Sequence, residues 1–474
     1  MLKGVELRDY QERILNELSY VPSIGLFMKT GSGKTITSLA RFDKNPTPHL
    51  LVICPQKIVT QWFDVIENVT DLKPCRYNMN HSAKKKDKII SDYLLDDYNP
   101  HKCVVVNFDI VCKLDCLEWA INEDWTIIID ESHKIKNIGT SRSPVKITKK
   151  VLELGELTNY KIILTATPTE KENGGYIDYY SQLKFLGYLD MSYALFKNRY
   201  CWEEKIQYPG MPFPIKKITG YRMPFIEKEI MPLLQASCRF YAPKYGEYEP
   251  QHITVNIPRC DSYAKMLSDK TYKEITFDNV SAFRIGKKTL TSGIVTGTDE
   301  YKERYTYKDN TNKLDWVEEM LSNTDDVVAI VYNYNVERDA IKEVCEKLGK
   351  KYIVIDGSVK DKPKELKKEF DVVIGQYGAF GESIDGLQYK CHLMILYSLP
   401  DSSEKYKQTI GRIDRDGQTE MPIYYHLIME KTLDVGVAEL IKNKVDFSEK
   451  DLDMLSLKES EEFENNIWSL YTWD

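Results

Sequence analysis

The sequence predicts an α/β protein of two lobes, each a mainly parallel β-sheet flanked by helices, with an irregular, partly helical insertion between the two sets of strands. Short apolar runs rich in β-branched residues recur along the chain, and charged segments of helical character separate them. The 474 residues are enough for roughly two or three domains at about 150 residues each. Two similar lobes account for both the pattern and the length.

The apolar runs fall into two sets. Helix-compatible stretches at 57–68 and 109–120 separate runs of the first set, and stretches at 313–321 and 336–348 do so in the second. The first set comprises residues 24–27, 50–54, 103–106, 126–129 and 161–164, and the second comprises residues 327–332, 351–355, 371–374, 393–397 and 423–428. We expect each set to form one sheet.

The stretch between the sets, residues 183–308, is rich in Tyr, Pro and Lys and lacks a regular strand–helix rhythm, although 261–276 has helical character. Pro243, Gly246 and Pro250 punctuate the chain and mark the crossing between lobes. We therefore expect an N-terminal lobe over 1–240 and a C-terminal lobe over 241–444, with the insertion at about 259–310.

The last thirty residues, 445–474, hold nine acidic and two basic residues, with Trp468 and Trp473 near the end. We expect a helical brace that docks through its aromatic side chains. An acidic tail that binds another protein is the alternative.

Composition and charge narrow the class of protein. Lys and Arg number 65 against 72 Asp and Glu, a net charge of −7, so any polyanion must be met by a local basic groove. No apolar run reaches the length of a membrane span, and the N-terminus lacks the layout of a secretory signal. The ten cysteines are scattered singly, as is typical of reduced thiols. We expect a cytoplasmic protein with no membrane partner.

The first apolar run leads into a glycine-rich turn and then a helical segment. Small residues let backbone amides approach phosphate oxygens, and the helix N-terminus adds partial positive charge. Lys34 would neutralise phosphate oxygens, and the Thr35 hydroxyl would ligate Mg²⁺. Met28 stands where the usual pattern has glycine, but the strand before and the helix after support the motif. The sequence therefore predicts ATP and Mg²⁺ as cofactors, bound by Thr30, Gly31, Ser32, Gly33, Lys34 and Thr35.

Two adjacent carboxylates, Asp130 and Glu131, follow the fourth apolar run. This places them at the carboxyl edge of a parallel sheet, where ligands bind in α/β folds. Asp130 is the predicted magnesium ligand, and Glu131 would polarise the attacking water. A solvated acidic turn is the alternative for two carboxylates taken alone.

Two arginines, Arg412 and Arg415, lie three residues apart in the second half of the chain. On a helix they would share one face. Guanidinium groups stabilise the charge that develops on a transferring phosphoryl group, so these side chains suit a γ-phosphate. An ordinary surface salt-bridge pair is the alternative.

Taken in order, the segments Leu7-Arg8-Asp9-Tyr10-Gln11, TGSGKT, VICPQKIVTQW, DESH, LTATP and QTIGRIDRDGQ resemble the motifs of superfamily 2 helicase-type ATPases. The resemblance covers nearly the whole chain. The stretches DESHKIKN and DGS are most similar to the Swi/Snf-type double-stranded DNA translocases, although LTATP replaces the LTGTP of the remodellers. The resemblance implies two RecA-like lobes and a nucleic-acid-dependent ATPase.

The resemblance also implies individual roles. Gln11 would bind the adenine edge, Tyr10 would flank the base, and Asp385 would belong to the ATP site. Arg412 and Arg415 match the arginine-finger motif, so the catalytic set would be Lys34, Glu131, Arg412 and Arg415. Coupling between the nucleotide and nucleic acid would involve His133, Thr165, Thr167, Gly381 and Gln408.

Nucleic-acid contacts are harder to predict, because loops that bind a phosphate backbone need only a few basic and hydroxyl side chains. Lysine runs are candidates, although such runs are usually solvated surface. The Tyr-rich stretch 301–307 could also stack on bases. The lysines proposed are Lys84, Lys85, Lys86, Lys287 and Lys288.

We therefore expect an ATP-dependent motor that moves on DNA, with duplex DNA favoured and single strands as the alternative, in replication, recombination or repair. Its size favours a compact prokaryotic or phage form, located in the cytoplasm of a prokaryote or of a phage-infected host. One alternative is a strand-separating DNA or RNA helicase. Another is an ATP-gated clamp or loader subunit for a nuclease or primase.

Overall fold

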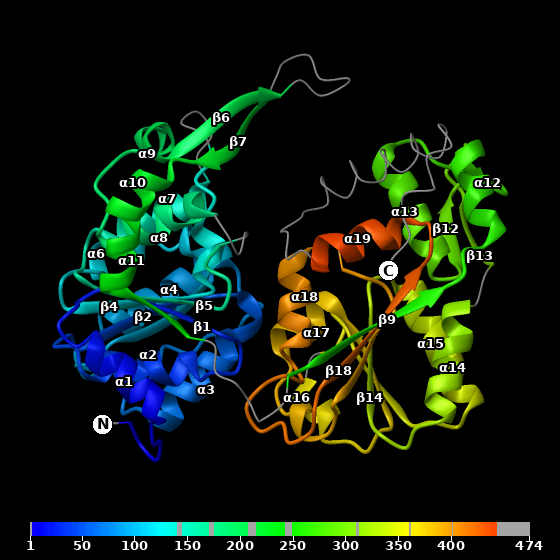
Figure 1. Ribbon diagram of the computed structural model, residues 1–474. Coiled ribbons are helices and arrows are strands. Elements are labelled where there is room, and N and C mark those ends of the chain that lie inside the picture. Colours follow the sequence, from blue (N-terminus) through cyan, green and yellow to red (C-terminus); the bar gives the residue numbers. More distant parts are fainter. Residues whose placement is uncertain are drawn as a thin grey trace. The chain divides into compact units, whose positions relative to one another are not determined.

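The computed structural model describes residues 2–139, 145–169, 175–206, 215–241, 249–309, 312–359, 362–400 and 402–442 (Figure 1). The chain divides into two compact units, Met1–Pro243 and Lys244–Asp474. Each unit contains a six-stranded sheet flanked by helices. The predicted fold class, a two-lobed α/β protein, is confirmed.

The sheet of the N-terminal unit has the order β3-β2-β4-β5-β1-β8, and all neighbouring strands are parallel. Its strands are β1 (Ile24–Met28), β2 (His49–Cys54), β3 (Cys103–Asn107), β4 (Trp125–Asp130), β5 (Tyr160–Thr165) and β8 (Cys238–Tyr241). The first five confirm the predicted apolar runs. The sixth, β8, was not predicted, because it is short, partly exposed and distant in sequence from β1, the strand with which it pairs.

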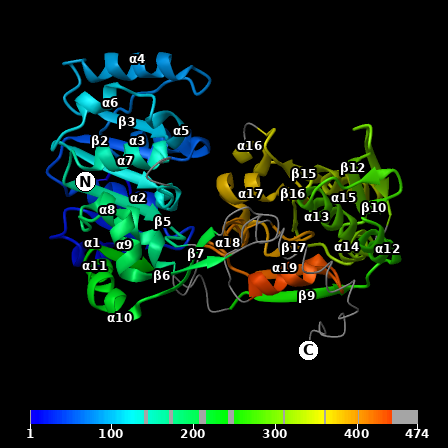
Figure 2. The same ribbon diagram turned by 90° about the horizontal axis from the view of Figure 1, so that it is seen from above.

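Figure 1 shows α1 to α3 on one side of this sheet and α7 and α8 on the other, and Figure 2 gives the view from above. The helices are α1 (Asp9–Glu17), α2 (Lys34–Asp43), α3 (Val59–Val69), α4 (Ala83–Leu94), α5 (Phe108–Val111), α6 (Cys116–Ala120), α7 (Lys146–Gly155), α8 (Tyr179–Leu186), α9 (Tyr193–Tyr200), α10 (Met223–Phe225) and α11 (Met231–Ser237). Short 3₁₀ turns occur at Gln56–Ile58, Ser132–Ile135 and Tyr176–Asp178, and a π turn at Ile226–Ile230.

The stretch predicted as one helix at 109–120 is instead two short helices, α5 and α6. A carboxylate of Asp87, on α4, accepts the backbone N–H of Cys116 at 3.1 Å. This tertiary hydrogen bond satisfies the first amide of α6 and lets the chain start a second helix.

A two-stranded antiparallel hairpin lies outside the sheet of this unit (Figure 1). It consists of β6 (Cys201–Ile206) and β7 (Ile215–Tyr221), with a register shift between Trp202 and Glu203. The sequence gives no apolar alternation strong enough to predict it.

The sheet of the C-terminal unit has the order β15-β16-β14-β17-β18-β9 and is also parallel throughout. Its strands are β9 (Gln251–Ile257), β14 (Val328–Tyr332), β15 (Tyr352–Ile355), β16 (Val372–Gln376), β17 (Leu393–Leu396) and β18 (Ile423–Met429). Five confirm the second predicted set. The edge strand β9 was not predicted, because most of its side chains are exposed and its pattern is only weakly apolar.

The helices of this sheet confirm the two predicted segments as α14 and α15. They are α14 (Asn312–Ser322), α15 (Asn335–Lys347), α16 (Lys362–Leu366), α17 (Tyr377–Ser383), α18 (Ser403–Ile410) and α19 (Leu433–Lys442), with a 3₁₀ turn at Leu387–Tyr389.

The insertion is less irregular than predicted. It contains a four-stranded antiparallel sheet of order β10-β11-β12-β13. The helix predicted at 261–276 is correct only as far as Asp269, because Lys270 adopts a left-handed conformation with φ of 54° and ends it. The elements are α12 (Asp261–Asp269), β10 (Thr271–Tyr272), β11 (Ile275–Thr276), α13 (Val280–Thr291), β12 (Ile294–Thr298) and β13 (Arg304–Lys308).

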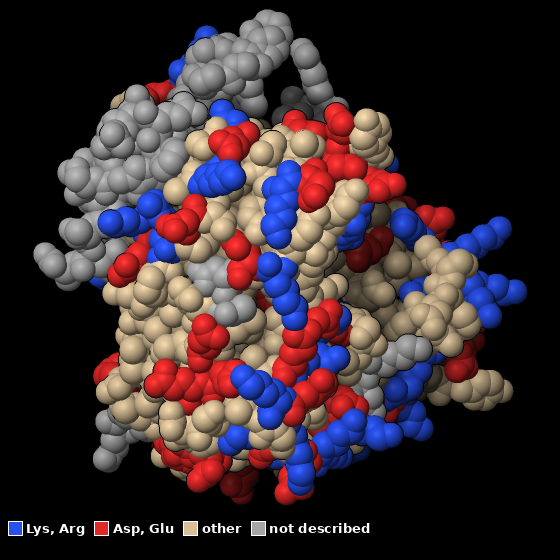
Figure 3. All heavy atoms as spheres, turned by 90° about the vertical axis from the view of Figure 1, so that its right-hand side faces the viewer, with Lys and Arg blue, Asp and Glu red and all other residues tan. Residues whose placement is uncertain are grey.

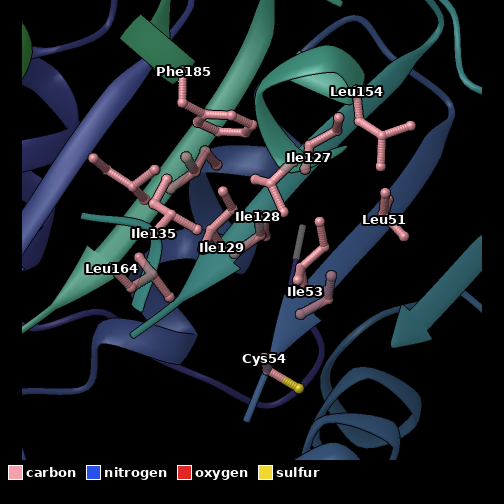
Figure 4. Packing of buried hydrophobic residues seen from close by; sticks show 14 of the residues in the cluster. Leu51, Ile53, Cys54, Ile127, Ile128, Ile129, Ile135, Leu154, Leu164 and Phe185 are labelled. Atoms are coloured by element: carbon pink, nitrogen blue, oxygen red, sulfur yellow. The ribbon is translucent and has the colours of Figure 1, made fainter. Parts of the chain in front are cut away.

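The core of the N-terminal unit forms where its central strands meet the covering helices. Figure 4 shows Ile127 and Ile129 of β4 beside Ile53 of β2, with Leu154 of α7 and Phe185 of α8 packed near them. All five side chains are buried. This apolar packing holds the carboxyl ends of β2, β4 and β5 in fixed positions relative to one another.

Among the described residues, no helix is long and apolar enough to cross a membrane. The brace predicted at 445–474 lies outside the described residues.

Candidate functional site

The glycine-rich turn lies between β1 and α2, as predicted. Gly31 and Gly33 have φ of 83° and 72°, a left-handed conformation that glycine adopts without strain. The Lys34 ammonium donates to the backbone oxygens of Met28 at 2.9 Å and Lys29 at 3.3 Å. The lysine therefore lies over the loop whose phosphate-binding role was predicted for residues 30–35.

Gln11, on α1, is buried and braces this loop. Its amide nitrogen donates to the Thr37 hydroxyl at 3.0 Å and to the backbone oxygens of Ser32 and Gly33 at 3.4 and 3.3 Å. Its amide oxygen accepts the N–H of Arg8 at 3.0 Å. A Cβ at position 33 would lie 2.6 Å from the Gln11 nitrogen, so the contact also requires glycine there. The predicted contact between Gln11 and adenine stays a prediction.

Tyr10 lies beside the same loop. Its hydroxyl donates to the Ser32 backbone oxygen at 2.8 Å, and its ring stacks on Tyr241 at a centroid distance of 4.4 Å. Tyr241 ends β8, so the unpredicted edge strand brings a second aromatic ring to the loop. Sequence spacing could not reveal this pair, because 231 positions separate the two tyrosines.

The acidic pair lies where β4 ends, as predicted. The indole N–H of Trp62 donates to one oxygen of Asp130 at 2.9 Å, and the backbone N–H of Glu131 donates to the other at 3.0 Å. Glu131 has φ of 57°, an uncommon conformation for a residue with a side chain. Backbone strain of this kind is concentrated at functional sites.

Two predicted coupling residues converge on Glu131. The Nδ1 atom of His133 lies 3.2 Å from a Glu131 oxygen and 3.0 Å from the Thr165 hydroxyl. The Thr165 hydroxyl lies 3.4 Å from the same Glu131 oxygen, and it accepts the backbone N–H of Thr167 at 3.0 Å. The ends of β4 and β5 are thus joined by one hydrogen-bonded group.

The surroundings of the pair shift the pKa values of the two carboxyls in opposite directions. Burial and the neighbouring charge of Glu131 raise the pKa of Asp130. Burial opposes ionisation of Glu131 as well, but His133 and Lys34 outweigh it and lower the pKa of Glu131. Lys34 also acts to lower the pKa of Asp130, so its ammonium lies close enough to influence both carboxyls.

The donor set fits Mg²⁺. Asp130 and Thr35 supply oxygen atoms, which are the ligands that Mg²⁺ prefers, and Mg²⁺ usually takes its remaining ligands from water and nucleotide phosphates. Burial and the charge of Glu131 raise the pKa of Asp130, and a cation bound at this carboxylate would compensate for both.

The arginine pair of the C-terminal unit does not lie on a helix, contrary to the prediction. The helix α18 ends at Ile410, and Arg412 and Arg415 occupy the turns after it. Gly411, which directly follows the helix, interrupts the run of helix-forming residues. Both guanidinium groups nevertheless point the same way, because each donates to the backbone oxygen of Ile384, at 2.7 Å for Arg412 and 3.5 Å for Arg415.

The other predicted residues of this unit surround the arginines. Arg412 also donates to the backbone oxygen of Gly381, and a Cβ at Gly381 would lie 3.2 Å from the Cβ of Gln408. Asp385, predicted in the ATP site, is 72% exposed and pairs with Arg415 at 3.2 Å. The structure thus brings Gly381, Gln408, Asp385 and both arginines together within the C-terminal unit.

Three of the five predicted nucleic-acid lysines are buried, which contradicts their assignment. Lys86 packs near the ring of Tyr77, Lys287 near the ring of Phe283, and the Lys288 ammonium donates to the backbone oxygen of Leu399 at 3.0 Å. An ammonium group held inside the protein cannot neutralise a phosphate backbone. Lys84 and Lys85 are exposed on α4.

The face shown in Figure 3 carries basic and acidic side chains interspersed. The predicted stacking stretch, 301–307, enters β13 at Arg304, and Tyr305 and Tyr307 pack against the apolar core of the insertion. Their rings are parallel within 5° and 6.2 Å apart. Packing thus accounts for both tyrosines.

Residues 21–233 match the model of the family described as the SNF2-related domain. Among solved structures, the chain is similar to the Sulfolobus solfataricus SWI2/SNF2 ATPase core in complex with dsDNA, at 19% identity and a TM-score of 0.41, over 97% of this chain and 95% of that chain. It is also similar to the Sulfolobus solfataricus SWI2/SNF2 ATPase core domain, at 17% identity and a TM-score of 0.40, over 99% and 96%. The family match spans the phosphate loop, the acidic pair and Thr165, so this part of the chain is similar to the SNF2-related domain.

Proposed function

We propose that this ATPase is a DNA translocase, which couples ATP hydrolysis to movement along DNA, with duplex DNA as the favoured track. One observation carries the proposal: Lys34, the acidic pair and the group formed by His133 and Thr165 meet at one edge of the N-terminal sheet. The duplex preference rests on the match to the SNF2-related domain and on the DESHKIKN segment.

Each residue at this edge has a role that follows from its surroundings. Lys34 neutralises phosphate oxygens, and Thr35 with Asp130 would hold Mg²⁺, which supplies charge neutralisation to the phosphates when it is bound. Glu131 orients the attacking water and accepts its proton, for which its ionised state is suited. Through His133 and Thr165, a shift of the segment after β5 would move Glu131 and so alter turnover.

Arg412 and Arg415 have different partners, which indicate different roles. Arg412 is held by two backbone oxygens, Gly381 and Ile384, and so supports the turn. Arg415 pairs with the exposed carboxylate of Asp385, a partner that it can exchange at little cost. We therefore assign the γ-phosphate contact to Arg415 and a positioning role to Arg412.

On the strength of the same motifs we also propose that the motor acts in replication, recombination or repair of DNA. Lys84 and Lys85 are the remaining lysine candidates for backbone contacts. Such contacts carry no sequence information, so we expect binding that is insensitive to sequence and weakened by salt.

Steady-state ATP hydrolysis tests the proposal, measured with no nucleic acid, single-stranded DNA, blunt duplex DNA and RNA. Lys34→Ala serves as the inactive control, and Lys44→Ala, exposed at the other end of α2, serves as the matched one. Strong stimulation by the duplex supports translocation on double-stranded DNA. Stimulation by single strands or RNA alone favours a strand-separating helicase. No stimulation by any nucleic acid favours an ATP-gated clamp or loader subunit, whose ATP hydrolysis would require a nuclease or primase partner.

The hairpin formed by β6 and β7 favours strand separation as the second candidate. It lies outside the sheet and carries Trp202, which is 55% exposed beneath the guanidinium of Arg222 at 4.2 Å. An exposed indole can stack on the last base pair of a duplex. Displacement of a strand from a forked duplex, lost in Trp202→Ala while ATP turnover persists, would support this candidate.

A further inference from the structure

Trp62 makes a polar contact that packing alone does not require. The side chain lies in the first turns of α3 and is only 2% exposed, so it could serve simply as a core aromatic residue. Its indole N–H, however, donates to the Asp130 carboxylate at 2.9 Å. A buried indole usually finds a hydrogen-bond partner. Burying a carboxylate beside the indole costs free energy, so the choice of Asp130 as this partner indicates a role beyond packing.

The topology explains how two residues separated by 68 positions meet. The strands β2 and β4 are parallel neighbours, with Ile53 paired with Ile129, so both chains leave the sheet at the same edge. After β2 the chain makes one 3₁₀ turn and enters α3, which brings the indole above the end of β4. The position of Trp62 is thus set by the same edge that positions the acidic pair.

The contact determines the orientation of the carboxylate. Trp62 engages one oxygen of Asp130 and the backbone N–H of Glu131 engages the other, so rotation about the last side-chain bond would break both hydrogen bonds. Each oxygen retains lone pairs for a further ligand. A hydrogen-bond donor to a metal-binding carboxylate is the arrangement by which surrounding residues fix a ligand in place.

We infer that Trp62 is a positioning residue, which holds the Asp130 carboxylate in the orientation that receives Mg²⁺ together with nucleotide. The inference rests on the proposed function, because it assumes that Asp130 is the magnesium ligand. It also assigns a task to the helix after β2, since any ligand that displaces α3 would tilt Asp130.

The chain offers a matched control. Trp125 is likewise 2% exposed and belongs to the same sheet, but it begins β4, whereas Asp130 ends it. Its ring packs on His49 at 5.2 Å. Trp62→Phe and Trp125→Phe therefore remove the same atoms from the same core, but Trp62→Phe alone removes a donor to Asp130.

The first test measures binding of a fluorescent, non-hydrolysable ATP analogue to the full chain while Mg²⁺ is titrated. We expect Trp62→Phe to need about tenfold more Mg²⁺ for half-maximal binding, the order of effect seen when a supporting hydrogen bond to a metal ligand is lost. Affinity for the analogue without Mg²⁺ should not change, and Trp125→Phe should follow the wild type.

The second test uses the wild-type side chain at position 62, so it does not depend on folding of the tryptophan variant. The seven tryptophans are labelled with ¹⁵N at the indole, and spectra of the wild type and Asp130→Asn are compared. Loss of a charged acceptor should move one indole proton upfield. Addition of Mg²⁺ and the analogue to the wild type should shift the same resonance.

The outcomes separate the two claims. Equal Mg²⁺ requirements for Trp62→Phe and Trp125→Phe, or unchanged indole resonances in Asp130→Asn, would overturn the role of Trp62. A wild-type chain that binds no nucleotide at any Mg²⁺ concentration would overturn the proposed function, and with it this inference.

Discussion

The helices that follow β1 and β14, α2 and α15, begin differently in the two units. In the N-terminal unit, α2 follows Gly33, which has no side chain to cap it, so its first amides face the phosphate loop. In the C-terminal unit, the two residues before α15 have amides that are already bonded: Glu337 accepts the N–H of Asn333 at 2.9 Å and of Tyr334 at 3.1 Å. One helix start is open to an external anion, and at the other the carboxyl group of Glu337 takes that place.

Neighbouring side chains complete the surroundings of the Glu337 carboxyl group. The hydroxyls of Ser292 and Ser398 donate to Glu337 at 2.6 and 2.8 Å, and Glu337 is fully buried. Ser292 directly follows α13, so the insertion closes this edge of the sheet. The same architecture therefore leaves room for the predicted nucleotide in one unit and supplies internal cohesion in the other, depending on whether the amides at the helix start are already satisfied.

The largest expected effect comes from Arg415→Ala. If the C-terminal unit contributes charge to hydrolysis without a nucleotide site of its own, nucleic-acid-stimulated turnover should fall about a thousandfold while nucleotide affinity stays the same. Turnover and equilibrium binding of a fluorescent analogue measure the two quantities. Arg304→Ala, exposed on β13 of the same unit, is the control. Unchanged turnover in Arg415→Ala would refute the arginine-finger assignment.

Removing the Glu337 carboxyl group tests the C-terminal half of the comparison. Glu337→Ala leaves two amides and two hydroxyls without their buried acceptor, and we expect the free energy of unfolding of the C-terminal sheet to drop by about 3 kcal/mol. Hydrogen exchange of peptides from β14 and β17 measures this loss. Glu343→Ala, on the same helix but exposed, should cost less than about 1 kcal/mol. Loss of nucleotide binding in Glu337→Ala would contradict the separation of roles.

The open helix start should be sensitive to a single methyl group. Gly33→Ala forces a Cβ to 2.6 Å from Gln11 at a positive φ, and we expect nucleotide affinity to fall roughly tenfold to thirtyfold, corresponding to about 1–2 kcal/mol of strain. Equilibrium binding measures it. Gly4→Ala also has a positive φ but meets no atom within 4 Å, so it controls for backbone strain alone. Equal affinities in the two variants would mean that the Gln11 brace is dispensable.

The smallest effect is a pH dependence confined to the C-terminal sheet. Burial, with the nearby His252, lowers the pKa of His426 to about 4, whereas an unfolded histidine titrates near 6.5. The folded state therefore prefers the neutral ring, and its contribution is complete above about pH 6.5 and is lost as the pH falls toward 4. Between roughly pH 7 and pH 5.5 we expect a loss of about 1 kcal/mol.

Hydrogen exchange of β18 peptides measures this loss. His426→Gln keeps a partner for the Tyr406 hydroxyl, which lies 3.0 Å from the histidine ring nitrogen, but cannot titrate in this range. The pH dependence should therefore shrink in His426→Gln and remain in His101→Gln, an exposed position of the N-terminal unit. An undiminished slope in His426→Gln would assign the dependence to another group.

Local motifs explain why much of the N-terminal site was predictable. The turn at Gly31 and Gly33 needs only its own residues and the flanking strand and helix, and the acidic pair needs only to follow a buried strand. Lys287 shows the opposite case. From the sequence, adjacent lysines such as Lys287 and Lys288 are expected at the solvent-exposed surface. In the structure, α13 packs against the rest of its unit and both lysines are buried. The prediction for Arg412 and Arg415 was wrong in one respect only. The two side chains lie close together as expected, but on a turn rather than on a helix.

By itself, the sequence determined ten strands of the two large sheets, the glycine-rich loop between β1 and α2, the order of the motifs and the family that they resemble. Each of these depends on residues close together in the chain. The tertiary structure alone decided the edge strands β8 and β9, the sheet within the insertion, the stacking of Tyr10 on Tyr241, and the hydrogen bond between Trp62 and Asp130. These contacts join segments far apart in sequence, and their energy comes from pairing and burial that exist only once the sheets have formed.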